Sequence, residues 1–167
     1  FIKTGVYNKN RDFHTTISPS MDILISSNLE RFLYDLTGKD DKVVSDWMKQ
    51  LVENGVYQVS DEVKEKLNGL FSAGCCDDKE TIAAIRKTAK DYGYVIDTHT
   101  AVAKSVYDKY VEETGDNTKT VIASTASPFK FNQSVLIALE DHNAVLGKDE
   151  FALLQTLSEK SNMKIPT

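Results

Sequence analysis

Small hydroxyl side chains follow a short apolar run in residues 121–131, whose sequence is Val-Ile-Ala-Ser-Thr-Ala-Ser-Pro-Phe-Lys-Phe. The apolar part predicts a buried strand, and Ser127 followed by Pro128 is typical of the N-cap and first position of a helix. A strand that ends in hydroxyls just before a helix often forms a small-molecule site in α/β proteins. Ser124 and Thr125 are therefore candidate ligand-binding residues. The alternative is that their hydroxyls only cap the following helix.

A second polar cluster, Asp97-Thr98-His99-Thr100, follows an apolar stretch and opens a predicted helix. Asp97 or Thr98 would cap this helix, and the free N–H groups of its first turn would favour an anion. His99 could carry a proton or contact a phosphate, because imidazole exchanges a proton near neutral pH. The alternative is a first-turn histidine that is hydrogen-bonded to a nearby loop.

The third cluster is the sequence Ser-Pro-Ser-Met-Asp at residues 18–22. Hydroxyls beside a proline predict a turn, and Asp22 could hold that turn through bonds from its side chain to the backbone. Ser18, Ser20 and Asp22 are therefore candidates either for ligand contact or for structural support of the turn.

Other chemistry is sparse in the sequence. Lys130 and Arg31 are candidate phosphate contacts, and the alternative for each is a solvated helix surface. The adjacent Cys75 and Cys76 do not make a zinc site, so we expect no metal. No glycine-rich phosphate loop is visible, and no lysine lies in a recognisable Schiff-base motif, so no catalytic residue can be assigned.

Apolar residues recur at helical spacing along most of the chain and predict seven helices. The helical stripes begin near Leu29, Val43, Val63, Ile82, Val102, Val135 and Phe151. Short strands are predicted at residues 21–26, 70–74, 94–97 and 120–124, and the last three alternate with helices. This pattern predicts an α/β fold with a small, mainly parallel sheet covered by helices. Residues 28–70 would form a helix-rich segment or small lobe.

The composition is that of an ordinary globular domain, with 41% hydrophobic and 27% charged residues. A net charge of -5 argues against a nucleic-acid surface, and no apolar run is long enough to span a membrane. No signal-peptide pattern opens the chain, so we expect a cytoplasmic protein with reduced thiols. The first residue is Phe1, which suggests an excised or cleaved piece.

The three polar clusters together resemble the carboxyl-terminal third of threonine synthases, which are pyridoxal-phosphate enzymes of fold type II. The most specific match is Ser-Pro-Ser-Met-Asp at residues 18–22 with Asn28 close behind. The stretch from Thr125 to Phe131 resembles the terminal Thr-Ala-small/His-Pro-x-Lys-Phe motif of the family. Ser127 stands where many relatives carry histidine, so no role of that histidine can be carried over.

The resemblance implies that residues 1–27 and 71–167 belong to the cofactor domain. Thr125 would face the pyridine nitrogen of pyridoxal phosphate, and Ser124 would replace it if the strand register differs by one residue. The residues implied for substrate binding are Ser18, Ser20, Asp22, His99 and Lys130.

The resemblance also implies that the intact enzyme converts O-phospho-L-homoserine and water to L-threonine and phosphate. The Schiff-base lysine and the phosphate loop would lie in the missing amino-terminal part of the same chain. We therefore expect this polypeptide alone to be inactive and not to bind the cofactor. The alternatives are a non-enzymatic α/β ligand-binding or interaction module, or another fold-type II enzyme such as threonine dehydratase or cysteine synthase. The latter enzymes typically lack the Ser-Pro-Ser-Met-Asp pattern.

Overall fold

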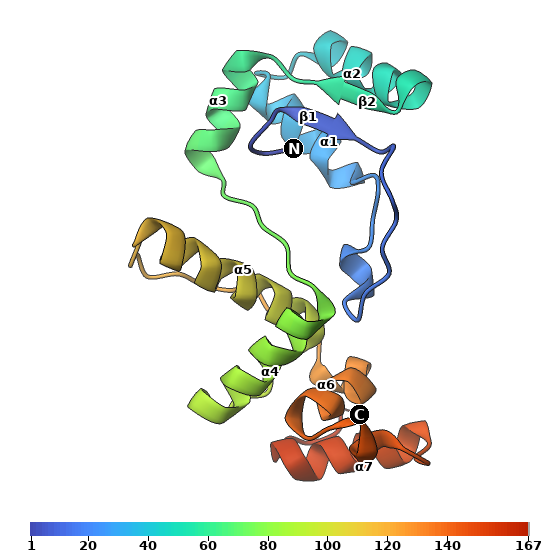
Figure 1. Cartoon of the computed structure of the whole chain (residues 1–167). Coiled ribbons are helices and arrows are strands. Elements are labelled where there is room, and N and C mark those ends of the chain that lie inside the picture. Colours follow the sequence, from blue (N-terminus) through green and yellow to red (C-terminus); the bar gives the residue numbers. More distant parts are fainter. Residues whose placement is uncertain (167) are drawn as a thin grey trace. The chain divides into compact units, whose positions relative to one another are not determined.

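The computed structural model describes residues 1–166, which form two compact units. Unit 1 comprises residues 1–14 and 22–73, and unit 2 comprises residues 15–21 together with the chain from residue 74 onward. Helices dominate both units (Figure 1). No helix among the described residues is long and apolar enough to cross a bilayer.

Unit 1 is a helical unit with one short antiparallel ladder. Its elements are β1 (Val6–Asn8), α1 (Ser27–Leu36), α2 (Asp41–Asn54), β2 (Val56–Gln58) and α3 (Asp61–Leu70). β1 pairs with β2 so that Tyr7 lies opposite Tyr57. The Asp40 side chain caps α2 by accepting from the backbone N–H groups of Lys42 and Val43, and Gly55 ends this helix at a φ of 75°. A positive φ suits glycine because it has no Cβ to clash with the backbone.

The core of unit 1 is aromatic and aliphatic, and its side chains come from all three helices, from β2 and from the residue that follows β2. Its buried members are Leu33, Val44, Trp47, Leu51, Tyr57, Val59, Val63 and Leu67. Tyr57 stacks between Tyr7 and Trp47, with ring centroids 5.4 and 6.1 Å away. This stack fixes the β1–β2 ladder against α2.

Burial, reinforced by electrostatic repulsion from Tyr7 and from the Glu30 carboxylate, raises the pKa of Tyr57 well above its ordinary value of 10.0. A tyrosine in the unfolded chain ionises near this ordinary value, so the folded state is fully favoured below pH 10 and loses stability as the pH rises above it. The expected loss is about 1.4 kcal/mol per pH unit above 10. Denaturant unfolding followed by circular dichroism on both sides of pH 10 measures this loss.

Tyr57→Phe is the matched control because it keeps the ring and removes the ionisable hydroxyl. Its stability should fall less steeply above pH 10 than that of the wild type. Identical slopes for the two proteins would contradict the assignment to Tyr57.

Unit 2 is built from helices around a second apolar core. Its elements are η1 (Pro19–Met21), α4 (Asp78–Tyr92), α5 (Thr98–Thr114), η2 (Pro128–Phe131), α6 (Asn132–Leu139), η3 (His142–Val145) and α7 (Glu150–Ser161). α4 packs against α5 and α6, and α6 packs against α7. The buried core residues are Ile85, Val95, Ile96, Ala101, Phe129, Val135, Leu136, Ala138, Leu153 and Leu157.

The predicted α/β fold with a parallel sheet was wrong. The described residues contain only the two-stranded antiparallel sheet of β1 and β2, and residues 21–26, 70–74, 94–97 and 120–124 form no strand. A short apolar run shows that side chains avoid water, but a strand also needs a partner backbone for its N–H and C=O groups. Val95 and Ile96 are buried in the helical core without such a ladder, and Val121 is 91% exposed.

The predicted helices were confirmed. Every predicted stripe lies in one of α1 to α7, and residues 28–70 carry α1, α2 and α3 together with β2. The three- to four-residue spacing identified these elements because each helix buries one side of its surface.

Candidate functional site

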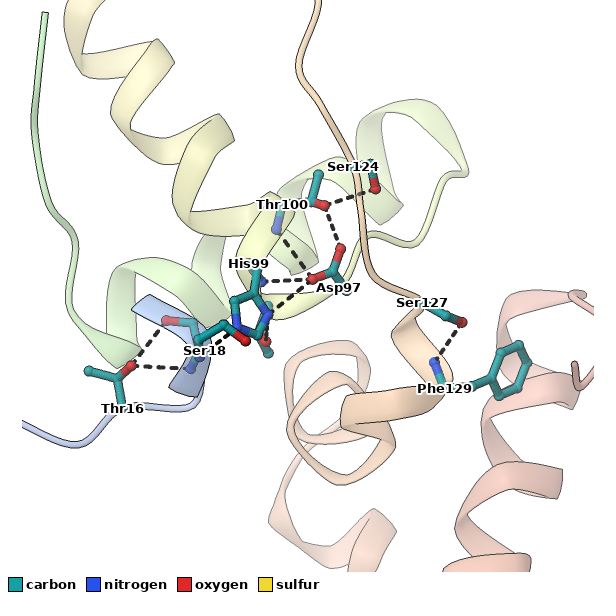
Figure 2. A network of polar contacts seen from close by, with 10 residues as sticks. Thr16, Ser18, Asp97, His99, Thr100, Ser124, Ser127 and Phe129 are labelled. Carbon is teal, nitrogen blue, oxygen red and sulfur yellow. Dashed lines mark hydrogen bonds and ion pairs between the residues drawn. The ribbon is translucent and has the colours of Figure 1, made fainter. Parts of the chain in front are cut away.

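Asp97 is the centre of a polar network in unit 2 (Figure 2). It is the N-cap of α5, directly after the buried Val95 and Ile96, and it is itself only 1% exposed. Its Oδ1 accepts from the backbone N–H groups of His99, at 2.8 Å, and Thr100, at 3.3 Å. The N–H groups at the start of α5 are thus bound by the chain's own carboxylate.

The second oxygen of Asp97 fixes the direction of a hydroxyl chain. Thr100 Oγ1 donates to Asp97 Oδ2, because an ionised carboxylate can only accept. The Ser124 hydroxyl lies 2.9 Å from the same Thr100 oxygen. Since the proton of Thr100 points to Asp97, Ser124 must donate to Thr100. In this arrangement the Ser124 proton is directed to Thr100, and the Ser124 oxygen can accept a bond from a ligand.

His99 is held at both ring nitrogens. Its Nε2 accepts from the backbone N–H of Ser20 at 3.0 Å, so this nitrogen carries no proton. In the neutral ring the proton is then on Nδ1, which lies 3.4 Å from Asp97 Oδ1 and 3.4 Å from Thr98 Oγ1. The ring packs against Phe131, with centroids 4.7 Å apart.

The turn around Ser18 is ordered by short-range bonds. Ser18 is buried, its backbone N–H donates to Thr16 Oγ1 at 3.1 Å, and its hydroxyl lies 3.0 Å from the same oxygen. Ile17 N–H donates to Asp78 Oδ1 at 3.1 Å, which fastens the turn to the first residue of α4. Ser20 is exposed, so its hydroxyl is accessible while its backbone N–H is bound to His99.

An ion pair joins α4, which carries Asp78, to α5, which carries His99. Lys109 Nζ of α5 lies 2.6 Å from Glu80 Oε1 of α4. The hydrogen bond from Lys109 lowers the pKa of Glu80, and the same bond raises the pKa of Lys109. Both groups stay charged at neutral pH, and the pair links α4 to α5.

The network brings together four of the predicted site residues, which are Ser18, Ser20, His99 and Ser124. Thr125 is exposed and takes no part in it. Lys130 is also exposed, with its Nζ 5.7 Å from the centre of the Phe131 ring. Asp22 belongs to unit 1, as does Arg31, which donates to Asn28. Residues 1–166 hold no cluster of potential metal ligands.

Sequence reasoning did not assign Thr100, Asp78 or Phe131 to the site. The spacing of Asp97 and Thr100 is the capping spacing, and this signal could have identified Thr100 as a partner of Asp97. Nothing in the sequence indicates that Thr100 meets Ser124, or that Phe131 covers His99, because these contacts depend on how unit 2 folds.

Comparison with known proteins gives a consistent result. A family model described as "Threonine synthase, C-terminal" matches residues 100–164. The human protein "Threonine synthase-like 1" is 40% identical over 141 residues, which cover 84% of this chain and 19% of that protein. The threonine synthase of Saccharomyces cerevisiae is 34% identical over 179 residues, covering 96% of this chain and 35% of the yeast enzyme.

Solved structures agree with the sequence matches. The crystal structure of threonine synthase from yeast superposes with a TM-score of 0.76 at 30% identity, covering 98% of this chain and 35% of that one. A structure titled as pyridoxal-phosphate-bound threonine synthase from Brucella melitensis gives a TM-score of 0.69 at 27% identity, covering 97% and 38%. The chain therefore spans about a fifth to two fifths of the length of these proteins.

Proposed function

Because the chain is homologous to the carboxyl-terminal region of threonine synthases, we propose that it contributes one wall of a pyridoxal-phosphate active site. The reaction proposed for the intact enzyme is conversion of O-phospho-L-homoserine and water to L-threonine and phosphate. The matched relatives are named for this synthase activity or for likeness to it, and one of them is titled as cofactor-bound.

The hydroxyl chain from Ser124 through Thr100 to Asp97 is the structural observation that distinguishes the roles of Ser124 and Thr125 in this wall. An unprotonated pyridine nitrogen needs a hydrogen-bond donor, and the proton of Ser124 is already directed to Thr100. Thr125 is exposed and lies outside the network, so its hydroxyl is free to donate. We therefore assign Thr125 to the pyridine nitrogen and assign Ser124 to holding the adjacent backbone in place.

Bound pyridoxal phosphate supplies an electron-accepting ring to the reaction. Thr125 would limit how strongly the ring accepts electrons, because a neutral hydroxyl does not stabilise a positively charged ring as a carboxylate would. The ring consequently depends on the rest of the site for charge stabilisation.

The substrate phosphate would be bound by exposed groups of unit 2. The Ser20 hydroxyl projects from the turn that His99 holds, and Lys130 offers a cation on η2. A dianionic phosphate favours such charge-assisted and hydroxyl donors. No proton transfer at the reacting carbon is assigned to residues 1–166, since none of them lies in a Schiff-base motif.

The proposal is tested with phosphate release from O-phospho-L-homoserine, measured in the presence of pyridoxal phosphate. The intact gene product is expected to turn over this substrate, and the 167-residue polypeptide alone is expected to show neither cofactor absorbance nor turnover. In the intact protein, Thr125→Val should lower kcat about tenfold, the effect of one lost hydrogen bond of about 1.4 kcal/mol. Ser124→Ala, the matched control, should lower kcat less, because the Ser124 hydroxyl is bonded to Thr100.

Three outcomes would overturn the proposal. Absence of turnover by the intact gene product would contradict the proposed reaction. Turnover by the 167-residue polypeptide alone would contradict the need for further residues. A Ser124→Ala effect that exceeds the Thr125→Val effect would reverse the assignment of the two hydroxyls. Ammonia release from L-threonine, without use of the phosphorylated substrate, would support the threonine dehydratase alternative.

A further inference from the structure

We propose that His99 is a positioning residue: it orients the Ser18–Ser20 turn toward the substrate phosphate without contacting the substrate itself. The inference rests on the proposed function, because it concerns how that site binds its phosphate. It reassigns His99 from a direct ligand to the support of one.

The ring of His99 has no nitrogen left for a substrate. Nε2 is occupied by the Ser20 N–H at 3.0 Å. Nδ1 faces the buried carboxylate of Asp97 and the hydroxyl of Thr98. Only 12% of the His99 side chain is exposed. A substrate group could reach a ring nitrogen only by breaking one of these contacts.

The contact with Ser20 joins two segments separated by 79 positions in the sequence. Met21 N–H donates to Ser18 O at 3.0 Å, which closes the η1 turn, and Pro19 has no N–H to give. The Ser20 N–H makes no bond within the turn and instead donates to His99 on α5. Its bond to His99 fixes the backbone from which the exposed Ser20 hydroxyl projects.

The ring itself is fixed from two further sides. Asp97 is anchored by the backbone N–H groups of α5, and its Oδ1 lies 3.4 Å from His99 Nδ1. The Phe131 ring packs against the His99 ring, with their centroids 4.7 Å apart. The contacts with Asp97 and Phe131 restrict the orientation of the His99 ring. Because the ring accepts from Ser20 N–H, they also restrict the turn.

The test uses two substitutions that separate the acceptor from the ring. His99→Phe keeps a planar ring against Phe131 but has no acceptor, whereas His99→Gln keeps a side-chain oxygen that can accept from Ser20 N–H. In the intact gene product, His99→Phe should raise the KM for O-phospho-L-homoserine about tenfold with little change in kcat, as loss of uniform binding predicts. His99→Gln should stay within about threefold of the wild type.

Ser20→Ala supplies the coupling measurement, because it removes the hydroxyl and keeps the backbone N–H. If His99 acts through this hydroxyl, the double variant His99→Phe with Ser20→Ala should be no worse than the poorer single variant. Hydrogen exchange at the Ser20 amide gives a readout independent of activity. His99→Phe should accelerate this exchange about fivefold, and His99→Gln should not.

The outcomes separate this inference from the proposed function. Accelerated exchange with an unchanged KM, or additive effects in the double variant, would overturn the positioning role while leaving the synthase activity intact. Failure of the wild type to use the substrate would overturn the proposed function, and the exchange rates would still show whether His99 holds the turn. Equal damage by His99→Gln and His99→Phe would also overturn the inference, because the acceptor would then not matter.

Discussion

Replacement of Asp97 by alanine is expected to lower the free energy of unfolding by about 3 kcal/mol or more, and to lower the proposed synthase activity of the intact gene product more than tenfold. The substitution removes the acceptor of two backbone N–H groups and of the Thr100 hydroxyl, in a side chain with 0% exposure. Each donor left unpaired in such a buried place costs about 1–3 kcal/mol. Activity falls because Thr100, which bonds Ser124, and His99 both lose the carboxylate beside them. Thermal unfolding followed by circular dichroism, together with phosphate release, measures the two effects.

Asp77→Ala is the matched control for Asp97→Ala. Asp77 is also an N-cap, with Glu80 N–H at 2.8 Å and a full capping box, but it is exposed at the start of α4. Asp77→Ala should lower the free energy of unfolding by about 1 kcal/mol, since water can replace the missing acceptor, and should leave activity unchanged. Equal losses of stability from the two substitutions would show that Asp97 acts only as a helix cap.

The helices of this chain could be predicted from sequence because their determinants are local. Apolar spacing identified the seven α-helices found within residues 1–166. Ser127 caps η2 ahead of Pro128 as predicted, and Asp40 and Ser60 cap α2 and α3.

The sheet could not be predicted, because its determinants are not local. Residues 94–97 and 120–124 have the apolar composition of buried strands, yet neither has a ladder in the described chain. The observed strands β1 and β2 are only three residues each and pair across about fifty positions. Strand formation depends on such distant partners, whereas composition reports only burial.

The candidate site shows the same division between local and distant determinants. The three polar clusters could be recognised one by one from residue type and spacing. Their assembly could not, since the bond from Ser20 to His99 and the bond from Ser124 to Thr100 span 79 and 24 positions. The direction of each bond, which decides what Ser124 and His99 can do chemically, follows only from the assembled geometry.

Leu67→Ala is expected to destabilise unit 1 by about 3 kcal/mol. Leu67 is 0% exposed within the core that contains Trp47 and Tyr57, and truncation leaves a cavity that the stacked rings cannot fill without moving. Trp47 is the one tryptophan in the sequence, so its fluorescence reports the unfolding of this core. The denaturant midpoint of the fluorescence transition should fall, with an unchanged slope.

Leu70→Ala supplies the same chemical change three residues later in α3, at a side chain that is 68% exposed. Little apolar surface is buried there, so its midpoint should move by no more than the equivalent of about 0.5 kcal/mol. The difference between the two variants measures burial alone, because the deleted atoms and the helix are the same. Similar shifts for both would mean that Leu67 is not enclosed by the core around Trp47, and the packing assigned to α3 would then be wrong.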